Sequence, residues 1–306
     1  MRPDVSIIIP AKNGVAGGID KCLKGVFSQK TNHSFEVIAI DSGSTDGTLD
    51  IVKSFDEVHL IQIKPEEFGH GRTRNLGARE AKGKYIVFLN QDAWPIDDNW
   101  LAPLISDLEN DGRAAGVYSR HLPKEGCYLC VARNIQRGMP ARKKVKKKTG
   151  ENLRAEDIFF STVSAAIKKE VFDKVPFKDD ILFAEDQMWS SDVLNAGYSI
   201  IYEPESKVYH SHNFSFKESY VFARDSQIFW QRLFGAKTHG IFLSAPYFIA
   251  HAIYMFCNST LYIISRNIPI KRKLNEVYIA FWSGCAAMLG EIAGVLKCGF
   301  SRSKAK

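Results

Sequence analysis

FEVIAIDSGSTDGT, residues 35–48, joins a β-branched apolar run to an aspartate and then to a loop of hydroxyl and glycine residues. A short apolar run closed by turn residues predicts a strand that is buried on both faces of a parallel sheet. Apolar residues at helical spacing resume from Leu49 to Phe55, so the loop marks a passage from strand to helix. Open α/β sheets bind ligands at such loops, beyond the carboxyl ends of their strands.

The same alternation extends to both sides of this loop. β-branched runs at 5–9, 58–63 and 85–89 predict further strands, and helical spacing at 19–29 and 72–82 predicts the helices between them. Alternating strands and helices favour a mostly parallel sheet with helices on both faces. We therefore expect an α/β fold in which polar residues that follow separate strands meet at one edge of the sheet.

The composition is that of a folded, basic protein with reduced cysteines. Of the 306 residues 45% are hydrophobic, enough for a large buried core, which favours a folded chain over a disordered one. The formal charge of +7 favours an anionic partner: a nucleic acid, a phosphorylated substrate or an acidic membrane surface. The six cysteines form no disulfide framework, which fits a reducing compartment. Cys127 and Cys130, a lone CxxC, are interpreted as structural rather than as a metal or redox site.

Carboxylates follow two of the predicted strands. Asp41 and Asp46 lie in the loop after 35–40, where they and the neighbouring hydroxyls would hold a nucleoside; the alternative is an ordinary turn with a helix cap. Asp92 follows 85–89 in NQDAWP, where a carboxylate can hold a divalent cation against two phosphates. A solvated loop aspartate is the alternative there.

Three further clusters carry candidate chemistry. GHGRTRNLGA places Arg74 in a glycine-flanked turn suited to anionic oxygens, unless this is only a surface helix start. Glu185 and Asp186 begin a predicted helix, where a carboxylate either removes a proton from an acceptor hydroxyl or simply complements the helix dipole. His210 and His212 form an HxH pair; His210 is the stronger candidate metal ligand, although such pairs are more often structural.

The order of these motifs within the first 215 residues carries a family resemblance. They are SIIIPAKN, VIAIDSGSTDGT, GHGRTRNLGA, YIVFLNQDAWP, AEDQMWSSDVLNAGY and YEPESKVYHSHNFS. Together they closely resemble the family 2 glycosyltransferases of GT-A fold, in particular the bacterial rhamnosyltransferase-like members. The resemblance implies a catalytic domain over 1–215 that transfers a hexose from a nucleotide diphosphate sugar with inversion. It also implies dTDP-L-rhamnose as the donor and a glycan or polyprenyl-diphosphate-linked acceptor, in cell-surface polysaccharide synthesis.

The resemblance implies roles for individual residues. Asp186 would be the general base, with Glu185 beside it to position the acceptor or the base. Asp92 would carry Mg²⁺ or Mn²⁺, and His210 joins it as a candidate ligand from its own motif. An asparagine stands where the family usually has its first metal-site carboxylate, which leaves the strictness of the metal requirement open. The nucleotide sugar would be bound by Pro10, Ala11, Asn13, Asp41, Ser44, Asp46, Arg74, Asn90 and Gln91.

A region rich in aromatic and apolar residues follows at 216–306. Its stretches 241–264 and 277–296 are long enough to cross a bilayer. Polar interruptions in both stretches, and cations in a loop that would lie outside the cell, oppose two spans. We therefore expect helices in the cytoplasmic membrane interface, or a hairpin packed against a partner chain, including a second copy.

A basic run at 142–148 contributes six cations. It lies within a charged segment, 137–154, for which we expect an exposed, mobile loop. Each cation contributes about 1 kcal/mol beside an anionic leaflet, so the run would favour a position near the membrane surface. The alternatives to this membrane contact are a solvated loop or a flap that contacts the acceptor's diphosphate.

Two other functions compete with sugar transfer. A sugar-nucleotide nucleotidyltransferase would show a glycine-rich phosphate loop after the first strand, which AKNGVAGG matches poorly. A nucleic-acid-binding protein would interleave aromatic residues with its basic patch, whereas the cations here gather in one run. We therefore expect a nucleotide-sugar donor and no nucleic-acid partner.

Overall fold

The computed structural model describes residues 2–181, 183–234 and 241–303, with side chains described from 246 to 298 in the last segment. The chain packs as two compact units. The first comprises Met1–Leu122 and Met139–His210, and the second comprises Pro123–Gly138 and Ser211–Lys306. The functional division predicted at residue 215 stays a prediction.

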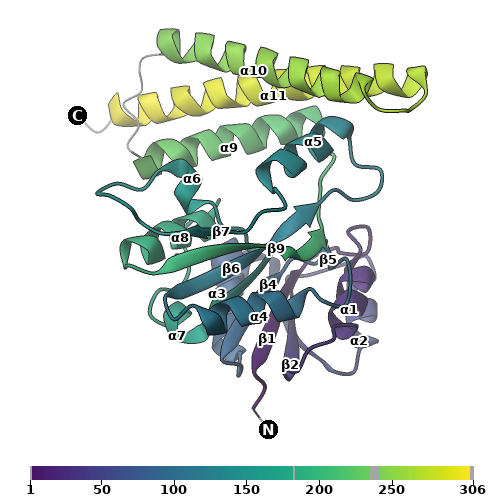
Figure 1. Cartoon of the computed structure of the whole chain (residues 1–306), viewed down its shortest axis with the longest axis vertical. Coiled ribbons are helices and arrows are strands. Elements are labelled where there is room, and N and C mark those ends of the chain that lie inside the picture. Colours follow the sequence, from purple (N-terminus) through teal and green to yellow (C-terminus); the bar gives the residue numbers. More distant parts are fainter. Residues whose placement is uncertain (1, 182, 235–240, 304–306) are drawn as a thin grey trace. The chain divides into compact units, whose positions relative to one another are not determined.

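The first unit is built on one mixed sheet in the order β3-β2-β1-β4-β8-β6-β9-β5, with β7 paired to β9 (Figure 1). β1, β2, β3 and β4 run parallel, with Ala11 of β1 opposite Asp41 of β2. β8 runs antiparallel to both β4 and β6, whereas β6 and β9 are parallel. The strands are β1 Val5–Ala11, β2 Phe35–Asp41, β3 Val58–Gln62, β4 Tyr85–Leu89, β5 Trp94–Pro95, β6 Ala114–Leu122, β7 Lys144–Lys146, β8 Ser164–Lys168 and β9 Ser199–Tyr209.

Helices cover both faces of this sheet. Side chains alternate between the faces along a strand, so Ile7 and Ile9 pack with α1 and α4 while Ile8 meets α3 at Gly77. The β1 strand is therefore buried on both sides, which explains why four of its first five residues are Val or Ile. The helices of this unit are α1 Ile19–Phe27, α2 Thr48–Lys53, η1 Pro65–Glu67, α3 His70–Glu80, α4 Leu101–Asn110, α6 Ala155–Ile158, α7 Lys169–Phe172 and α8 Glu185–Asn195.

The basic run is partly structured, so the prediction of a mobile loop over 137–154 is wrong for its centre. β7 pairs antiparallel with β9, and the amine of Lys143 forms an ion pair with Glu203 at 2.8 Å and a second one with Asp107. The amine of Lys146 donates to the carbonyl of Phe159 at 2.6 Å, and burial lowers the pKa of Lys146 to about 8. Two of the six cations thus hold the strand on the sheet.

The second unit is helical, with α5 Leu129–Gly138, α9 Phe216–Phe234, α10 Ile241–Ile264 and α11 Ile270–Ser303. α11 packs between α9 and α10, and Figure 1 shows the three long helices side by side. A Cβ added at Gly290 would lie 2.3 Å from the carbonyl oxygen of Tyr220, and one at Gly294 would lie 2.8 Å from that of Arg224. The Gly290 and Gly294 pair therefore serves close packing of α9 on α11 within the chain.

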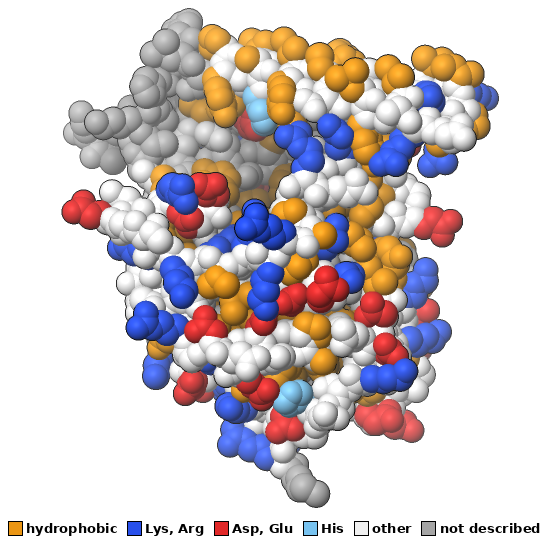
Figure 2. All heavy atoms as spheres, viewed as in Figure 1, with side chains coloured by type: hydrophobic (Ala, Val, Ile, Leu, Met, Phe, Trp, Pro, Cys, Tyr) orange, Lys and Arg blue, Asp and Glu red, His pale blue; other side chains and the backbone are white. Residues whose placement is uncertain are grey.

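An apolar face remains exposed on α10 and α11, and Figure 2 shows apolar side chains crowded along these helices. Within the described chain, Pro246–Ile264 and Ile270–Cys298 are long and apolar enough to cross a membrane, with 17% and 33% of their apolar windows buried. The exposed face comprises Tyr247, Ile249, Ile253, Tyr254, Leu261, Ile264, Ile270, Leu274, Tyr278, Phe281 and Leu289.

Candidate active site

The loops after β1 and β2 are joined by side-chain hydrogen bonds. The Asp41 carboxylate is 1% exposed and accepts from the backbone N–H groups of Gly43 and Ser44, both at 3.0 Å. The hydroxyl of Ser44 accepts from the backbone N–H of Asn13 at 2.8 Å. In return, the Asn13 side chain accepts from the N–H of Thr45 at 2.9 Å. Three predicted nucleotide-binding residues therefore form one rigid double loop at the sheet edge.

Asp46 organises the start of α2. One carboxylate oxygen accepts from the N–H of Val15 at 3.1 Å, and the other accepts from the N–H and hydroxyl of Thr48 at 3.1 and 2.5 Å. The Thr48 hydroxyl is the main cause that lowers the pKa of Asp46. Pro10 and Ala11 end β1 beside this loop, where the carbonyl of Ala11 accepts from the N–H of Ser42 at 2.9 Å.

The segment after β4 is held by partners on both sides. The Gln91 amide accepts from the backbone N–H of Lys12 at 2.9 Å and donates to the carbonyl of Lys12 at 2.7 Å. The side-chain oxygen of Asn90 accepts from the Arg74 guanidinium at 2.8 Å. Asn90 and Gln91 thus anchor the loop that carries Asp92.

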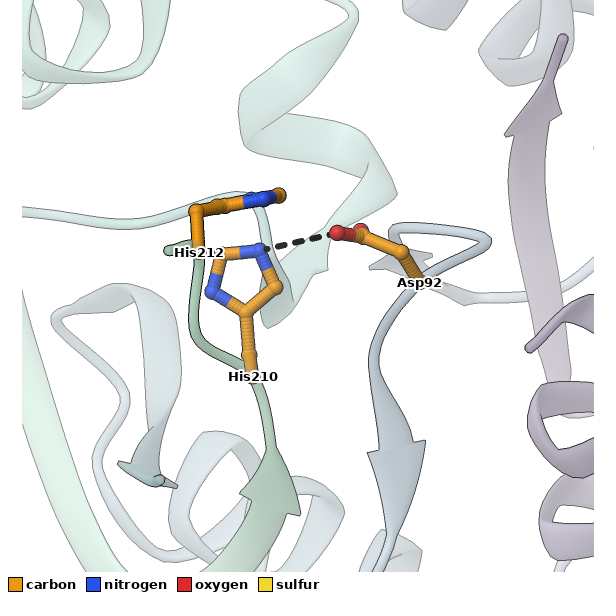
Figure 3. Close-up of side chains that lie close together, drawn as sticks. All are labelled: Asp92, His210 and His212. Carbon is orange, nitrogen blue, oxygen red and sulfur yellow. Dashed lines mark ion pairs between the residues drawn. The ribbon is translucent and has the colours of Figure 1, made fainter. Parts of the chain in front are cut away.

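Asp92 and His210 face one another, as Figure 3 shows, across 3.5 Å between the carboxylate Oδ2 and the imidazole Nε2. Their side chains are 17% and 14% exposed. The backbone N–H of His210, directly after β9, donates to the carbonyl of Leu122 at 2.9 Å, which fixes the strand end. Ligands of one ion at about 2.1 Å each lie about 3 Å apart when adjacent, so this donor pair fits a divalent cation. His212, also drawn in Figure 3, belongs to the second unit.

A third histidine lies beside this pair and was not predicted. The His121 ring packs edge-on against His210 with ring centres 5.5 Å apart, and its Nε2 is buried without a partner among the described residues. Burial first, and the neighbouring His210 second, lower the pKa of His121 to about 3, so its ring stays neutral. Only recognition of β6 as a strand could have placed His121 at this edge.

Arg74 is buried and forms the centre of a polar bridge. Its guanidinium donates to the Glu185 carboxylate at 2.8 Å, and both side chains are less than a tenth exposed. It also donates to the carbonyl of His70 at 3.1 Å and, as noted, to Asn90. Arg74 therefore links the end of β4 to the start of α8.

Asp186 lies next to this bridge in the first turn of α8. One of its oxygens accepts from the N–H and hydroxyl of Thr162 at 3.0 and 3.3 Å, and the other accepts from the N–H of Gln187 at 2.8 Å. Burial first, and the Glu185 charge second, raise the pKa of Asp186 to about 7. A carboxyl group with this pKa can accept a proton near neutral pH. Ala184, just before the helix, has a positive φ of 58°, a strained backbone of the kind that concentrates at functional sites.

These contacts bring separate segments of the first unit to one sheet edge. Asp41 is joined to the loop after β1, this loop is joined to the Asp92 segment, and Asn90 is joined through Arg74 to α8. A cavity of about 820 Å³ lies elsewhere, near Asp4 and Tyr85 at the starts of β1 and β4. That cavity is therefore separate from the candidate site.

Comparison with known proteins identifies the family of this chain and several relatives. The family model described as Glycosyl transferase family 2 matches residues 6–175. The O-antigen chain rhamnosyltransferase WbaN of Salmonella anatum is 33% identical over 231 residues, which cover 74% of this chain and 72% of the relative. The O-antigen chain rhamnosyltransferase RfbN of Salmonella typhimurium is 32% identical over 230 residues, with the same coverage of 74% and 72%.

Solved structures share the fold. The mannosyltransferase PcManGT from Pyrobaculum calidifontis, in complex with GDP-Man and Mn²⁺, aligns with a TM-score of 0.55 and 19% identity over 98% of this chain and 76% of its own. S. aureus TarS 1-349 in complex with UDP aligns with a TM-score of 0.57 and 17% identity over 97% and 92% of the two chains. The expected GT-A fold is thereby confirmed.

Proposed function

The chain belongs to glycosyl transferase family 2 and is a glycosyltransferase, and from this premise we propose that it transfers L-rhamnose from dTDP-L-rhamnose with inversion. The acceptor is a glycan or a lipid-linked sugar in cell-surface polysaccharide synthesis. The similarity to two O-antigen rhamnosyltransferases supports this donor and this pathway class. Family membership favours sugar transfer over the nucleotidyltransferase and the nucleic-acid-binding protein that the sequence left open.

The observation that carries the proposal is the Asp186 carboxyl, raised to a pKa of about 7 and held at the same sheet edge as the nucleotide loops. In the proposed reaction Asp186 takes the proton of the acceptor hydroxyl while that oxygen attacks the sugar carbon opposite the leaving nucleoside diphosphate. Thr162 and Gln187 aim its two oxygens through their N–H groups. The buried Arg74 and Glu185 pair fixes the start of α8 and so positions the base.

Donor binding is assigned to the double loop after β1 and β2. Asp41, Asn13 and Ser44 form its hydrogen-bonded frame, with Pro10, Ala11 and Asp46 at its borders. Asp92 and His210 would hold Mg²⁺ or Mn²⁺, to which the carboxylate is the better suited of the two ligands. When bound, the ion neutralises charge on the leaving diphosphate.

The second unit is proposed to lie on the cytoplasmic face of the membrane. The exposed apolar face on α10 and α11 would enter the interface between headgroups and acyl chains. Arg266 is exposed between the two helices, and Lys271 and Arg272 are exposed in the first turn of α11, where anionic headgroups would attract them. Binding to anionic vesicles that weakens with salt would support this placement. A stable dimer in vesicle-free buffer would instead assign the apolar face to a second copy.

A donor panel tests the proposed function. Full-length protein is incubated with dTDP-L-rhamnose, UDP-glucose and GDP-mannose, with Mn²⁺ or Mg²⁺ and lipid extract, and the release of nucleoside diphosphate is measured. Release from dTDP-L-rhamnose alone is expected, and release from another donor alone would refute the sugar assignment. Asp92→Ala is expected to abolish the dependence of donor binding on metal. Equal donor binding by the wild type with and without metal would refute the role of Asp92.

A further inference from the structure

The glycine-rich start of the chain packs against the segment that carries Asp92. A Cβ added at Gly14 would lie 2.3 Å from the side-chain oxygen of Gln91, and one at Gly17 would lie 3.1 Å from the Cβ of Asp92. One at Gly18 would lie 3.2 Å from the Trp94 ring, and one at Gly25 would lie 2.8 Å from the Pro95 ring. We call Gly14, Gly17, Gly18 and Gly25 the glycine track.

The track lets the 91–95 segment approach the helix start closely. Separations under 3.0 Å from a real Cβ essentially never occur, so a side chain at Gly25 would displace the Pro95 ring and one at Gly14 would displace the end of the Gln91 side chain. At Gly17 and Gly18 the neighbours would have to shift by a few tenths of an ångström. Gly18 has a φ of 98°, a left-handed conformation that glycine adopts without strain. Above the track, the amine of Lys21 lies 5.1 Å from the centre of the Trp94 ring. Residues 91–95 are thus held by packing contacts at several positions along the segment.

This packing reaches both candidate metal ligands. Asp92 rests directly on Gly17, while Trp94 and Pro95 form β5, which pairs with Tyr209 and Val208 of β9. His210 follows Tyr209 in the chain. The track therefore fixes the position of Asp92 at one end of the segment. At the other end it fixes β5, which pairs with the strand that precedes His210.

We propose that the glycine track positions Asp92 relative to His210, so that these four glycines shape the metal site by packing. The inference rests on the metal role proposed above for these two residues. Gly14, Gly17, Gly18 and Gly25 are accordingly positioning residues: side chains at these places displace the carboxylate by their bulk. Such supporting contacts typically change metal affinity 10–100-fold when removed.

A matched pair of substitutions tests this assignment. Gly17→Leu places a side chain against Asp92, and Gly112→Leu adds the same side chain where an added Cβ meets nothing within 4 Å. Binding of Mn²⁺ alone is titrated by electron paramagnetic resonance on full-length protein, and folding is followed by circular dichroism. Gly17→Leu is expected to weaken Mn²⁺ binding about tenfold, and Gly112→Leu less than twofold.

One reference variant, Asp92→Ala, keeps the outcomes distinct. If Asp92→Ala weakens Mn²⁺ binding but Gly17→Leu does not, the positioning role is overturned and the metal role stands. If Asp92→Ala leaves Mn²⁺ binding unchanged, the metal role fails and this inference falls with it.

Should Gly17→Leu fail to fold, a second pair replaces it. Gly14→Ala is expected to weaken Mn²⁺ binding by displacing the Gln91 side chain, which also holds the segment to Lys12. The double variant Gly14→Ala/Gln91→Ala is then expected to bind Mn²⁺ as well as Gln91→Ala alone, because the clash is gone. Additive losses would overturn the proposal.

Discussion

Replacing Asp186 by Asn removes the proposed base while preserving the shape of the side chain. The Asn oxygen can still accept a backbone hydrogen bond from Thr162 or Gln187, so α8 keeps its start. Transfer is expected to fall about 10²–10⁴-fold, the usual contribution of a general base. Donor affinity is expected to stay near that of the wild type, because the oxygens of Asp186 are engaged by Thr162 and Gln187 rather than by the double loop assigned to the nucleotide.

The wild type carries a matching pH signature. With a pKa of about 7, Asp186 is mostly protonated at pH 6 and mostly deprotonated at pH 8. Because only the deprotonated form can take the acceptor proton, transfer should rise about tenfold from pH 6 to pH 8 and level off above it.

The assay is nucleoside diphosphate release at saturating donor and acceptor, with constant metal, across this pH range. Donor affinity is measured by calorimetry on the same samples. The Asp186→Asn rate should be low and independent of pH. Two results would each refute the assignment: a wild-type rate that is equal at pH 6 and pH 8, or a variant that transfers sugar at the wild-type rate.

Three other substitutions have expected outcomes. Glu185→Gln removes a negative charge that raises the pKa of Asp186, so the variant should keep a larger fraction of its own pH 8 rate at pH 6 than the wild type does; an unshifted profile would contradict this. Gly290→Val overfills the contact of α11 with α9 and should lower the free energy of unfolding by about 1–3 kcal/mol, measured in urea; an unchanged midpoint would count against that contact. Lys143→Met removes the cation from the buried carboxylates of Asp107 and Glu203, so their pKa values rise. The free energy of unfolding should drop by about 1–2 kcal/mol, and it should drop more at pH 8, where both groups are charged, than at pH 5. The exposed Lys147→Met is its control, and equal loss in both variants would contradict the role of Lys143.

Three strands of the parallel half of the sheet were predictable because they are buried on both faces. β1, β2 and β4 must therefore be apolar at nearly every position, and β-branched runs result. β6 and β8 escaped prediction because their sequences are rich in Ala, Ser and Gly. Large side chains from elsewhere fill the space instead: the rings of Phe160 and Trp189 both come within 3.1 Å of a Cβ added at Gly116. A strand whose small side chains pack against large side chains from neighbouring elements shows little hydrophobic pattern in its own sequence.

Part of the candidate site could likewise be predicted from the sequence, and part could not. That polar residues at the ends of separate strands meet at one edge follows from parallel topology. Asp41 ends β2 and Asp92 follows β4, and these two strands flank β1 and run parallel to it. Partner choice could not be predicted, because Arg74 and Glu185 are 111 positions apart and pair only once α3 and α8 are packed. His121 was missed for a related reason, since an unrecognised strand carries it.

The guanidinium bridge at the sheet edge constrains how this enzyme can vary. Arg74 carries one positive charge, which Glu185 balances, while Asn90 contributes a neutral oxygen. Grafting the usual acidic motif by Asn90→Asp would leave the enclosed trio with a surplus negative charge, which is costly where water is scarce. The charges at these three positions therefore depend on one another. A new acid at position 90 would need a compensating neutral residue at position 185.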